Sequence, residues 1–281
     1  MSFRNTPSLT LIGAGKLGQS LGKLWTQHHA FRLQDVLTRS QESAQRAIAC
    51  IGVGEAVSDF ASLRRADVYL IATPDDRILS ACTALAQAGL LDANSIVFHC
   101  SGALPSSVLQ PAIERGAAVA SIHPIRSFAV PEQVVQNFTG TWCGMEGDRR
   151  ALDVLTPAFA AIGARLVPIK AEEKIHYHAA AVFACNYLVT LLDVARQSYQ
   201  RAGIDADAVL QMMAPLVRET VENVFKLGPE AALTGPVARG DMATAERQWQ
   251  AVAAADAAHG ELYAQLMRLT MELAQRRDAK R

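Results

Sequence analysis

A short apolar run followed at once by three spaced glycines constrains the fold of this chain more than any other feature. Leu9, Leu11 and Ile12 have the pattern of a buried strand, and Gly13-Ala14-Gly15-Lys16-Leu17-Gly18 follows as GxGxxG. In such a turn Gly13 allows the sharp bend, Gly15 lets a pyrophosphate approach the backbone, and Gly18 lets the next helix lie close to the sheet. The motif therefore predicts a phosphate cradle at a helix N-terminus, and the alternative is a plain structural turn.

The end of the second expected strand, Phe31–Thr38, bears on which dinucleotide would bind. An acidic residue at this point hydrogen-bonds the ribose of NAD, whereas a basic residue can accept the 2′-phosphate of NADP. Thr38, Arg39 and Ser40 supply a guanidinium and two hydroxyls, while the nearest acid, Asp35, lies inside the strand pattern. We therefore predict NADP rather than NAD, with these three residues at the phosphate. The alternative is that Arg39 is an ordinary exposed turn residue.

Strand and helix patterns alternate from the glycine motif Gly13–Gly18 to Pro168. Beyond the first two strands, we expect strands at 56–57, Asp67–Thr73, Ser95–His99, Ala117–Ile122, Thr139–Met145 and Arg165–Pro168, and helices at 41–51, 60–65, 78–89, 111–116 and 149–162. This alternation is typical of the α/β class. The sequence thus predicts a doubly wound, mostly parallel Rossmann sheet.

Polar residues stand at or just past the ends of several expected strands. They are Thr73, which Pro74 follows, His99, Ser101 and His123. Ligands of doubly wound sheets bind outside the carboxyl ends of the strands, so we expect these residues to gather at the cofactor. The alternative for either histidine is a hydrogen-bonded strand cap. Nothing in the spacing of His99, Cys100 and His123 defines a metal site, and we predict none.

From Ala171 onward the strand patterns stop and only helices are expected. A long apolar helix over 171–202 is followed by helices at 205–213, 215–227, 241–255 and 259–277. The chain therefore divides into a dinucleotide-binding domain, 1–168, and a helical substrate or dimerisation domain, 169–281. Because the first helix is apolar on most faces, we expect it to be buried between the domains or in a dimer core.

Polar residues on this apolar helix are candidates for chemistry. Lys174 and His178 are four residues apart and share a face, and Asn186 lies about two turns further on. We expect Lys174 to donate a proton, His178 to orient the substrate, and Asn186 to hold a polar group of the substrate or nicotinamide. The alternatives are a solvated first-turn lysine and a hydrogen-bonded core amide.

The segment Leu233–Asp241 is the second candidate in the helical half. Its Gly-Pro and Gly-Asp steps predict a rigid turn that ends with Asp241 as a helix N-cap. Arg239 could then reach a carboxylate or phosphate, or it could be a solvent-exposed basic loop residue.

Composition excludes several other classes of protein. Lys and Arg together number 27, as do Asp and Glu, so no net field would recruit nucleic acid or an anionic membrane. The five cysteines are scattered singly, which is typical of reduced thiols. No apolar run reaches the roughly 18 residues of a membrane span, and the start lacks a signal-peptide core. We expect a cytoplasmic protein.

A family resemblance adds to these inferences. The motifs Gly13–Gly18, His99–Ala103, His123-Pro124, Tyr177–Ala181 and Leu233–Asp241 resemble a bacterial NADP oxidoreductase family that joins a Rossmann-like domain to an uncharacterised helical domain. That family is related to the 6-phosphogluconate and β-hydroxyacid dehydrogenases and to pyrroline-5-carboxylate reductase. The resemblance implies a homodimer through the helical domains and, in some relatives, a deazaflavin cofactor.

The resemblance also bears on the chemistry of the long helix. In the β-hydroxyacid dehydrogenases a lysine and an asparagine one turn later serve catalysis. Lys174 matches the lysine, but His178 stands where the asparagine would be. The leading hypothesis is an NADP-dependent reductase or dehydrogenase of a small carbonyl, imine or hydroxyacid, with His123 and Asn186 orienting the substrate and Arg239 anchoring an anion. The alternative is a noncatalytic NADP(H) sensor.

Overall fold

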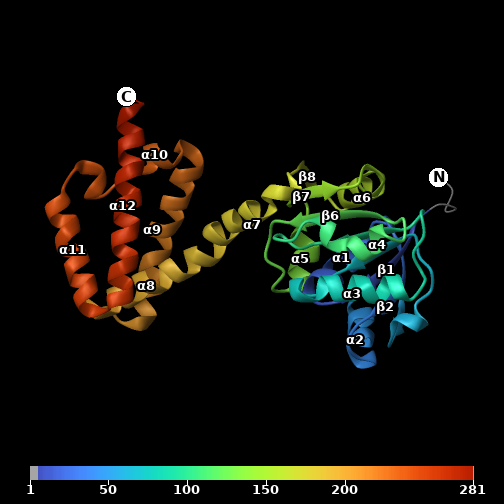
Figure 1. Cartoon of the computed structure of the whole chain (residues 1–281). Helices are drawn as coiled ribbons and strands as arrows, with labels where there is room; N and C mark the ends of the chain where they lie inside the picture. Colours follow the sequence, from blue (N-terminus) through green and yellow to red (C-terminus); the bar gives the residue numbers. More distant parts are fainter. Residues whose placement is uncertain (1–5, 281) are drawn as a thin grey trace. The chain divides into compact units, whose positions relative to one another are not determined.

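The structure is a computed structural model that describes residues 6–280. The chain divides into two compact units, Met1–Val182 and Phe183–Arg281. Each unit is described by itself below, and their helices and strands are labelled in Figure 1.

The first unit is built on one sheet of eight strands. All neighbouring strands are parallel except β6 and β7, which pair antiparallel. The strand order is β3-β2-β1-β4-β5-β6-β7-β8. The strands are β1 (Ser8–Ile12), β2 (Arg32–Leu37), β3 (Glu55–Val57), β4 (Val68–Ile71), β5 (Ile96–His99), β6 (Ala118–Pro124), β7 (Trp142–Gly147) and β8 (Arg165–Pro168).

Helices cover both faces of this sheet, and each face has its own apolar core (Figure 1). Helices α1 (Lys16–Gln27), α2 (Gln41–Ile51), α5 (Pro131–Asn137) and α6 (Arg149–Ala161) pack on one face. On the other face lie α3 (Asp75–Gln87) and α4 (Gln110–Ile113). Trp25 of α1 joins the first core, where its ring packs edge-on against Phe31 and Phe159. The predicted doubly wound α/β fold is therefore confirmed.

The differences from the predicted elements in this unit are local. Strand β6 continues to Pro124 and so includes His123, because β7 pairs with it that far. Helix α5 is not predicted by the sequence, since only seven residues and one buried side chain, Val134, carry its pattern.

The second unit is entirely helical among its described residues. Helix α11 packs along α12, and α9 contacts α8 and α10. A single helix, α9, replaces the two helices expected on either side of position 214, because Pro215 lies inside it without ending it. The helices are α8 (Leu188–Arg201), α9 (Ala206–Leu227), α10 (Pro229–Ala232), α11 (Met242–Ala255) and α12 (Ala257–Ala279).

The long helix expected over 171–202 is present but composite. A turn of 3-10 helix (Ala171–Glu173) leads into α7 (Lys174–Val182), a π-helical segment (Phe183–Tyr187) and then α8. The first compact unit ends at Val182, within this helix and 14 residues after the border expected at residue 168. The reason is that α7 makes its polar contacts with strands of the sheet.

The same helix corrects one expectation and leaves another untested. It spans 31 residues from Ala171 to Arg201, and its most apolar 18-residue window has a mean hydropathy of 1.5, so by length and composition one segment could cross a membrane. The sequence reading missed it because a few polar residues interrupt the apolar run. None of that window is buried within this single chain, so burial of the helix between the domains or in a dimer core stays a prediction.

Candidate functional site

The glycine motif forms the turn that its sequence predicts. Gly13 has a φ of +85°, and a side chain there would meet the backbone of Ala72 at 2.8 Å. A Cβ on Gly18 would lie 3.0 Å from the Gly13 carbonyl oxygen. Gly15 is different, because it is exposed and a Cβ there would meet nothing within 4 Å. The space over Gly15 is therefore open, whereas the other two glycines are required by packing.

The N-terminus of α1 opens toward this space. Gly15 is the N-cap residue, its backbone is extended, and no side chain of the described residues caps the first amides. Unpaired amides at a helix N-terminus attract an anion. Ala14 is buried and Leu17 packs against the core, while the Lys16 side chain is exposed. Ala14, Lys16 and Leu17 can therefore contribute backbone groups, and Lys16 also a charge.

The tip of β2 has the residue types that a 2′-phosphate site needs, but two of their hydroxyls already make local hydrogen bonds. Arg39 is exposed just past the strand. Thr38 Oγ1 donates to the carbonyl of Ser40, and Ser40 Oγ caps α2 by accepting from the Ser43 amide. Asp35 is fully buried and bound by Arg64 Nε at 2.9 Å, so its carboxylate cannot reach a ribose.

At the carboxyl ends of the strands, His99 and Ser101 form an enclosed cluster rather than an open rim. His99 is fully buried, its Nδ1 accepts from the Ser101 amide at 3.1 Å, and its Nε2 donates to the Pro105 carbonyl at 3.3 Å. Burial lowers the pKa of His99 to about 3, helped by the charge of Lys174. Ser101 Oγ donates to Asp75 at 2.7 Å. The His99 ring therefore holds the loop after β5 and is too enclosed to make the cofactor contact that was expected of it.

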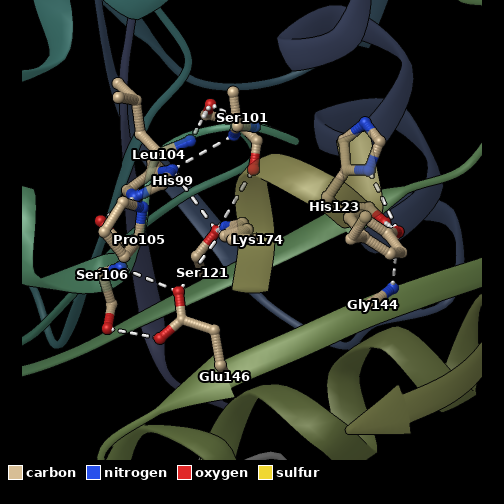
Figure 2. Close-up of polar contacts among 12 residues, drawn as sticks. His99, Ser101, Leu104, Pro105, Ser106, Ser121, His123, Gly144, Glu146 and Lys174 are labelled. Atoms are coloured by element: carbon tan, nitrogen blue, oxygen red, sulfur yellow. Dashed lines mark hydrogen bonds and ion pairs between the residues drawn. The ribbon is translucent and has the colours of Figure 1, made fainter. Parts of the chain in front are cut away.

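Lys174 lies at the centre of a buried polar network. Its ammonium is 1% exposed, donates to Ser121 Oγ and lies 3.5 Å from a Glu146 carboxylate oxygen (Figure 2). Glu146 in turn accepts from the amide and the hydroxyl of Ser106, both at 2.7 Å. Desolvation lowers the pKa of Lys174, and the Glu146 charge opposes that shift. The network ties α7 to β6 and β7.

His123 and His178 face each other across Gly102, on the outer side of this network. Their rings are 5.7 Å apart and edge-on. A Cβ on Gly102 would lie 2.3 Å from His178 Nδ1 and 2.9 Å from His123 Nε2, so only glycine fits there. Burial, followed by the charges of His178 and Lys174, lowers the pKa of His123 to about 4. His123, at the end of a strand, and His178, on the long helix, are therefore brought together, as their motifs suggested.

The two remaining predicted residues lie in the second unit. Asn186 is exposed and belongs to the π-helical segment, whose extra residue per turn changes the face on which later side chains stand. Asn186 is thus exposed in this unit taken alone, and its contact with the substrate or nicotinamide stays a prediction. Arg239 is exposed at the end of a 3-10 turn, and Asp241 caps α11 by accepting from the Thr244 amide at 3.1 Å, as predicted.

Several polar residues of the site were not selected from the sequence. Glu146 and Ser121 complete the buried network, the exposed Asp75 accepts from Ser101, and Tyr177 binds His123. Tyr177 and Gly102 lie within motifs that carry the family resemblance. Glu146 had one further signal, because a carboxylate in an apolar strand needs a buried partner.

The site fits a dinucleotide and offers no metal centre. Thr73 Oγ1 is buried without a partner among the described residues, and Thr73 stands beside Gly13, with Pro74 capping α3. A bound group at the cradle could satisfy that hydroxyl. Within residues 6–280 no group of three His, Cys, Asp or Glu side chains could hold a metal ion, and all five cysteines are free.

Comparison with known protein families confirms the resemblance drawn from the motifs. Residues 4–124 match the Rossmann-like domain, and residues 141–270 match a domain of unknown function, DUF2520. The chain is thus a Rossmann-like protein with a DUF2520 C-terminal domain. No curated protein matches it.

Solved structures share the fold. A protein from Bacteroides fragilis, described as a candidate NADP oxidoreductase, is 24% identical with a TM-score of 0.76, over 95% of this chain and 98% of that chain. A protein from Thermotoga maritima is 26% identical with a TM-score of 0.73, over 97% and 100%. An imine reductase from Myxococcus stipitatus in complex with NADP⁺ is 14% identical with a TM-score of 0.66, over 96% and 94%. Pyrroline-5-carboxylate reductases also share the fold.

Proposed function

We propose that this protein is an NADP-dependent oxidoreductase that acts on a small carbonyl, imine or hydroxyacid. The observation that carries the proposal is the turn Gly13–Gly18, where the space over Gly15 is open beside uncapped amides of α1. Backbone amides there would hold the pyrophosphate, and Arg39 the 2′-phosphate. When bound, the nicotinamide would give or accept a hydride. Structural neighbours with NADP bound support this choice of cofactor over NAD or a deazaflavin.

The substrate side of the proposal rests on His123 and His178. Both rings line Gly102, which lies just past the end of β5 and beside the carboxyl end of β6. This is the edge of a doubly wound sheet where ligands bind. Lys174 was the expected proton donor, but its ammonium is enclosed by Ser121 and Glu146. We therefore assign Lys174 to organising the site and leave proton exchange to an imidazole. Asn186 and Arg239 remain candidates for substrate contact from the helical unit.

Calorimetric titration with NADPH and NADH tests the cofactor. We expect NADPH to bind more tightly, and Arg39→Asp to reduce or reverse the preference, because a carboxylate repels the 2′-phosphate and can bond the NAD ribose. Arg32→Asp, an exposed substitution at the opposite end of β2, is the matched control and should leave the preference unchanged. Absence of binding by both dinucleotides would overturn the proposal.

A screen of NADPH oxidation over ketoacids, cyclic imines and a deazaflavin tests the reaction. Turnover of a ketoacid or a cyclic imine supports the proposal. Tight NADPH binding with no turnover of any compound, and with unchanged affinity in His123→Ala, would instead indicate a noncatalytic sensor of NADP(H).

We further propose that the helical unit pairs with a second copy of the chain. Large apolar side chains are exposed on α8, α9, α12 and the π-helical segment, far more than isolated surface residues would supply. They include Phe183, Tyr187, Val189, Leu210, Leu216, Phe225, Leu227 and Leu269. A homodimer would cover this surface without a membrane, and a cytoplasmic location stays a prediction.

A further inference from the structure

The hydroxyl of Tyr177 is placed where it decides which nitrogen of His123 carries hydrogen. It lies 3.1 Å from His123 Nδ1, 3.3 Å from the His123 carbonyl oxygen, and accepts from the Gly144 amide at 3.3 Å. His123 and Gly144 are paired residues of β6 and β7, so the hydroxyl bridges the two strands at that pair. Figure 2 shows His123 and Gly144 on either side of these contacts.

Counting hydrogens distinguishes the two possible tautomers. A tyrosine hydroxyl has one hydrogen to donate, and a neutral imidazole has one N–H. If Tyr177 donates to Nδ1, its contact with the His123 carbonyl contains no hydrogen, and only two of the three contacts are hydrogen bonds. If Nδ1 carries the hydrogen, it donates to the Tyr177 oxygen, the Tyr177 hydroxyl donates to the carbonyl, and all three contacts are satisfied.

The protonation states required by this scheme agree with the surroundings. Burial raises the pKa of Tyr177 to about 12, so its hydroxyl keeps its hydrogen. The pKa of His123 is about 4, so its imidazole is neutral at pH 7. The other ring nitrogen, Nε2, makes no hydrogen bond to the described residues and is not among the enclosed unpartnered atoms, so it is accessible beside Gly102.

The packing of Tyr177 leaves the hydroxyl little freedom. Its ring stands against Gly144, where a Cβ would lie 2.7 Å from the Tyr177 oxygen. It also packs edge-on to His123, with ring centroids 5.5 Å apart. Lys174, one turn earlier on α7, is held by Ser121 and Glu146. The position of the hydroxyl is therefore set by a glycine on β7 and by a buried ion pair.

We propose that Tyr177 is a positioning residue that holds His123 with hydrogen on Nδ1, so that Nε2 is the atom that exchanges a proton with the substrate. The inference rests on the proposed oxidoreductase function. In the oxidation direction the substrate O–H bond breaks and an Nε2–H bond forms. The O–H electron pair makes the C=O bond, and the C–H bond is lost as the hydride that a bound NADP⁺ would accept. In the reduction direction the imidazolium returns that proton to the substrate oxygen or nitrogen. The Tyr177 oxygen accepts from Nδ1–H in both states.

The tautomer can be measured without any ligand. Long-range ¹H–¹⁵N spectra of the full chain, with His123→Gln to assign the signals, report which imidazole nitrogen carries hydrogen. We expect Nδ1–H in the wild type at pH 7, and a shift toward Nε2–H in Tyr177→Phe, which removes the hydroxyl alone. Tyr263→Phe is the matched control, because Tyr263 bonds Gln248 in the helical unit. Nε2–H in the wild type, or an unchanged tautomer in Tyr177→Phe, would overturn the proposal.

Kinetics with the substrate found by the NADPH screen supply the second measurement. Tyr177→Phe should lower kcat by about 10- to 100-fold, less than the roughly 10²- to 10⁴-fold contribution of an acid–base group itself, because the imidazole is retained. The Kd for NADPH should be unchanged. In a double variant with His123→Ala, Tyr177→Phe should lower kcat no further than His123→Ala does alone. A purely structural role would lower stability and leave the tautomer unchanged. If the wild type neither binds NADPH nor turns over any compound, the proposed function fails, whereas the tautomer result still decides the role of Tyr177.

Discussion

Gly15 is the residue at which binding can be separated from folding. Its φ of −68° is ordinary for any residue, and a Cβ there meets nothing within 4 Å. Gly15→Val should therefore change the free energy of unfolding by less than about 0.5 kcal/mol, as for unconstrained surface positions. The same side chain would occupy the space over the uncapped amides of α1. We expect NADPH binding to be lost and urea denaturation to be almost unchanged, with Gly15→Ala intermediate in affinity.

Gly13 provides the contrast within the same turn. Its φ of +85° and the 2.8 Å approach of the Ala72 backbone leave no room for a side chain. Gly13→Ala should destabilise the protein as well as weaken binding, because both strain and overlap follow. Equal NADPH affinity in Gly15→Val and wild type would contradict the phosphate cradle, whatever Gly13→Ala does.

Two histidines, the buried His99 and the half-buried His123, predict how stability changes with pH. The pKa values of His99 and His123 in the fold, about 3 and about 4, lie below the ordinary value of 6.5. Between these values the unfolded chain binds more protons than the folded one. Stability should therefore be full above about pH 6.5 and should fall toward pH 4, by up to about 1.4 kcal/mol per pH unit for each histidine.

Urea denaturation at pH 7 and pH 5 measures this effect. His99→Asn should lower stability at pH 7, since it removes the bond to the Pro105 carbonyl, but should reduce the loss between the two pH values. The exposed His28 supplies the control, and His28→Gln should keep the wild-type loss. An unchanged loss in His99→Asn would show that His99 does not contribute to it.

At the scale of elements, α7 is attached to the sheet by one buried ion pair. Lys174 on the helix and Glu146 on β7 are 3.5 Å apart, and both are less than a tenth exposed. Removing one partner of a buried pair leaves an uncompensated charge and costs about 3 to 5 kcal/mol. Glu146→Gln should lose stability in this range. Glu146 also has both of its oxygens bound by Ser106, so Lys174→Met should cost less.

A double-mutant cycle in urea tests the pairing. The double variant Lys174→Met with Glu146→Gln should be more stable than the sum of the single losses predicts, by about 1 kcal/mol or more. The exposed pair Arg149 and Asp153 on α6 is the control, and Asp153→Asn should cost less than about 1 kcal/mol. Additive losses, or equal effects of Glu146→Gln and Asp153→Asn, would contradict an attachment through the ion pair.

For the whole molecule, the exposed apolar surface of the helical unit predicts self-association. Phe225 is 85% exposed and Val189 66% exposed, which is costly in water for side chains of this size. Light scattering behind size exclusion should give twice the mass of one chain. Combined Val189→Glu and Phe225→Glu should shift the protein toward monomers, whereas Val53→Glu, on an exposed apolar residue of the first unit, should not.

The same measurement distinguishes a dimer from a membrane-bound protein. A monomer that partitions onto lipid vesicles would indicate that the apolar helix Ala171–Arg201 meets a membrane instead of a second chain. A monomer that stays in solution would contradict both.

The sequence alone was enough to determine the sheet, its winding and the cradle, because these depend on local pattern. Apolar runs of strand length and glycines that relieve backbone overlap act within a few residues of one another. The helix N-cap at Asp241 and the place of Asp35 within strand β2 were also readable, since each follows from its neighbours in the chain.

Only the tertiary structure decided what the polar residues at the strand ends do. His99 and His123 look alike in sequence, yet the first is enclosed by Pro105 and Ser101, while the second keeps one nitrogen accessible beside Gly102. Lys174 is enclosed because Glu146, 28 residues earlier, lies beside it on β7. The roles of these residues depend on burial and on partners distant in the chain, and no local pattern records those partners.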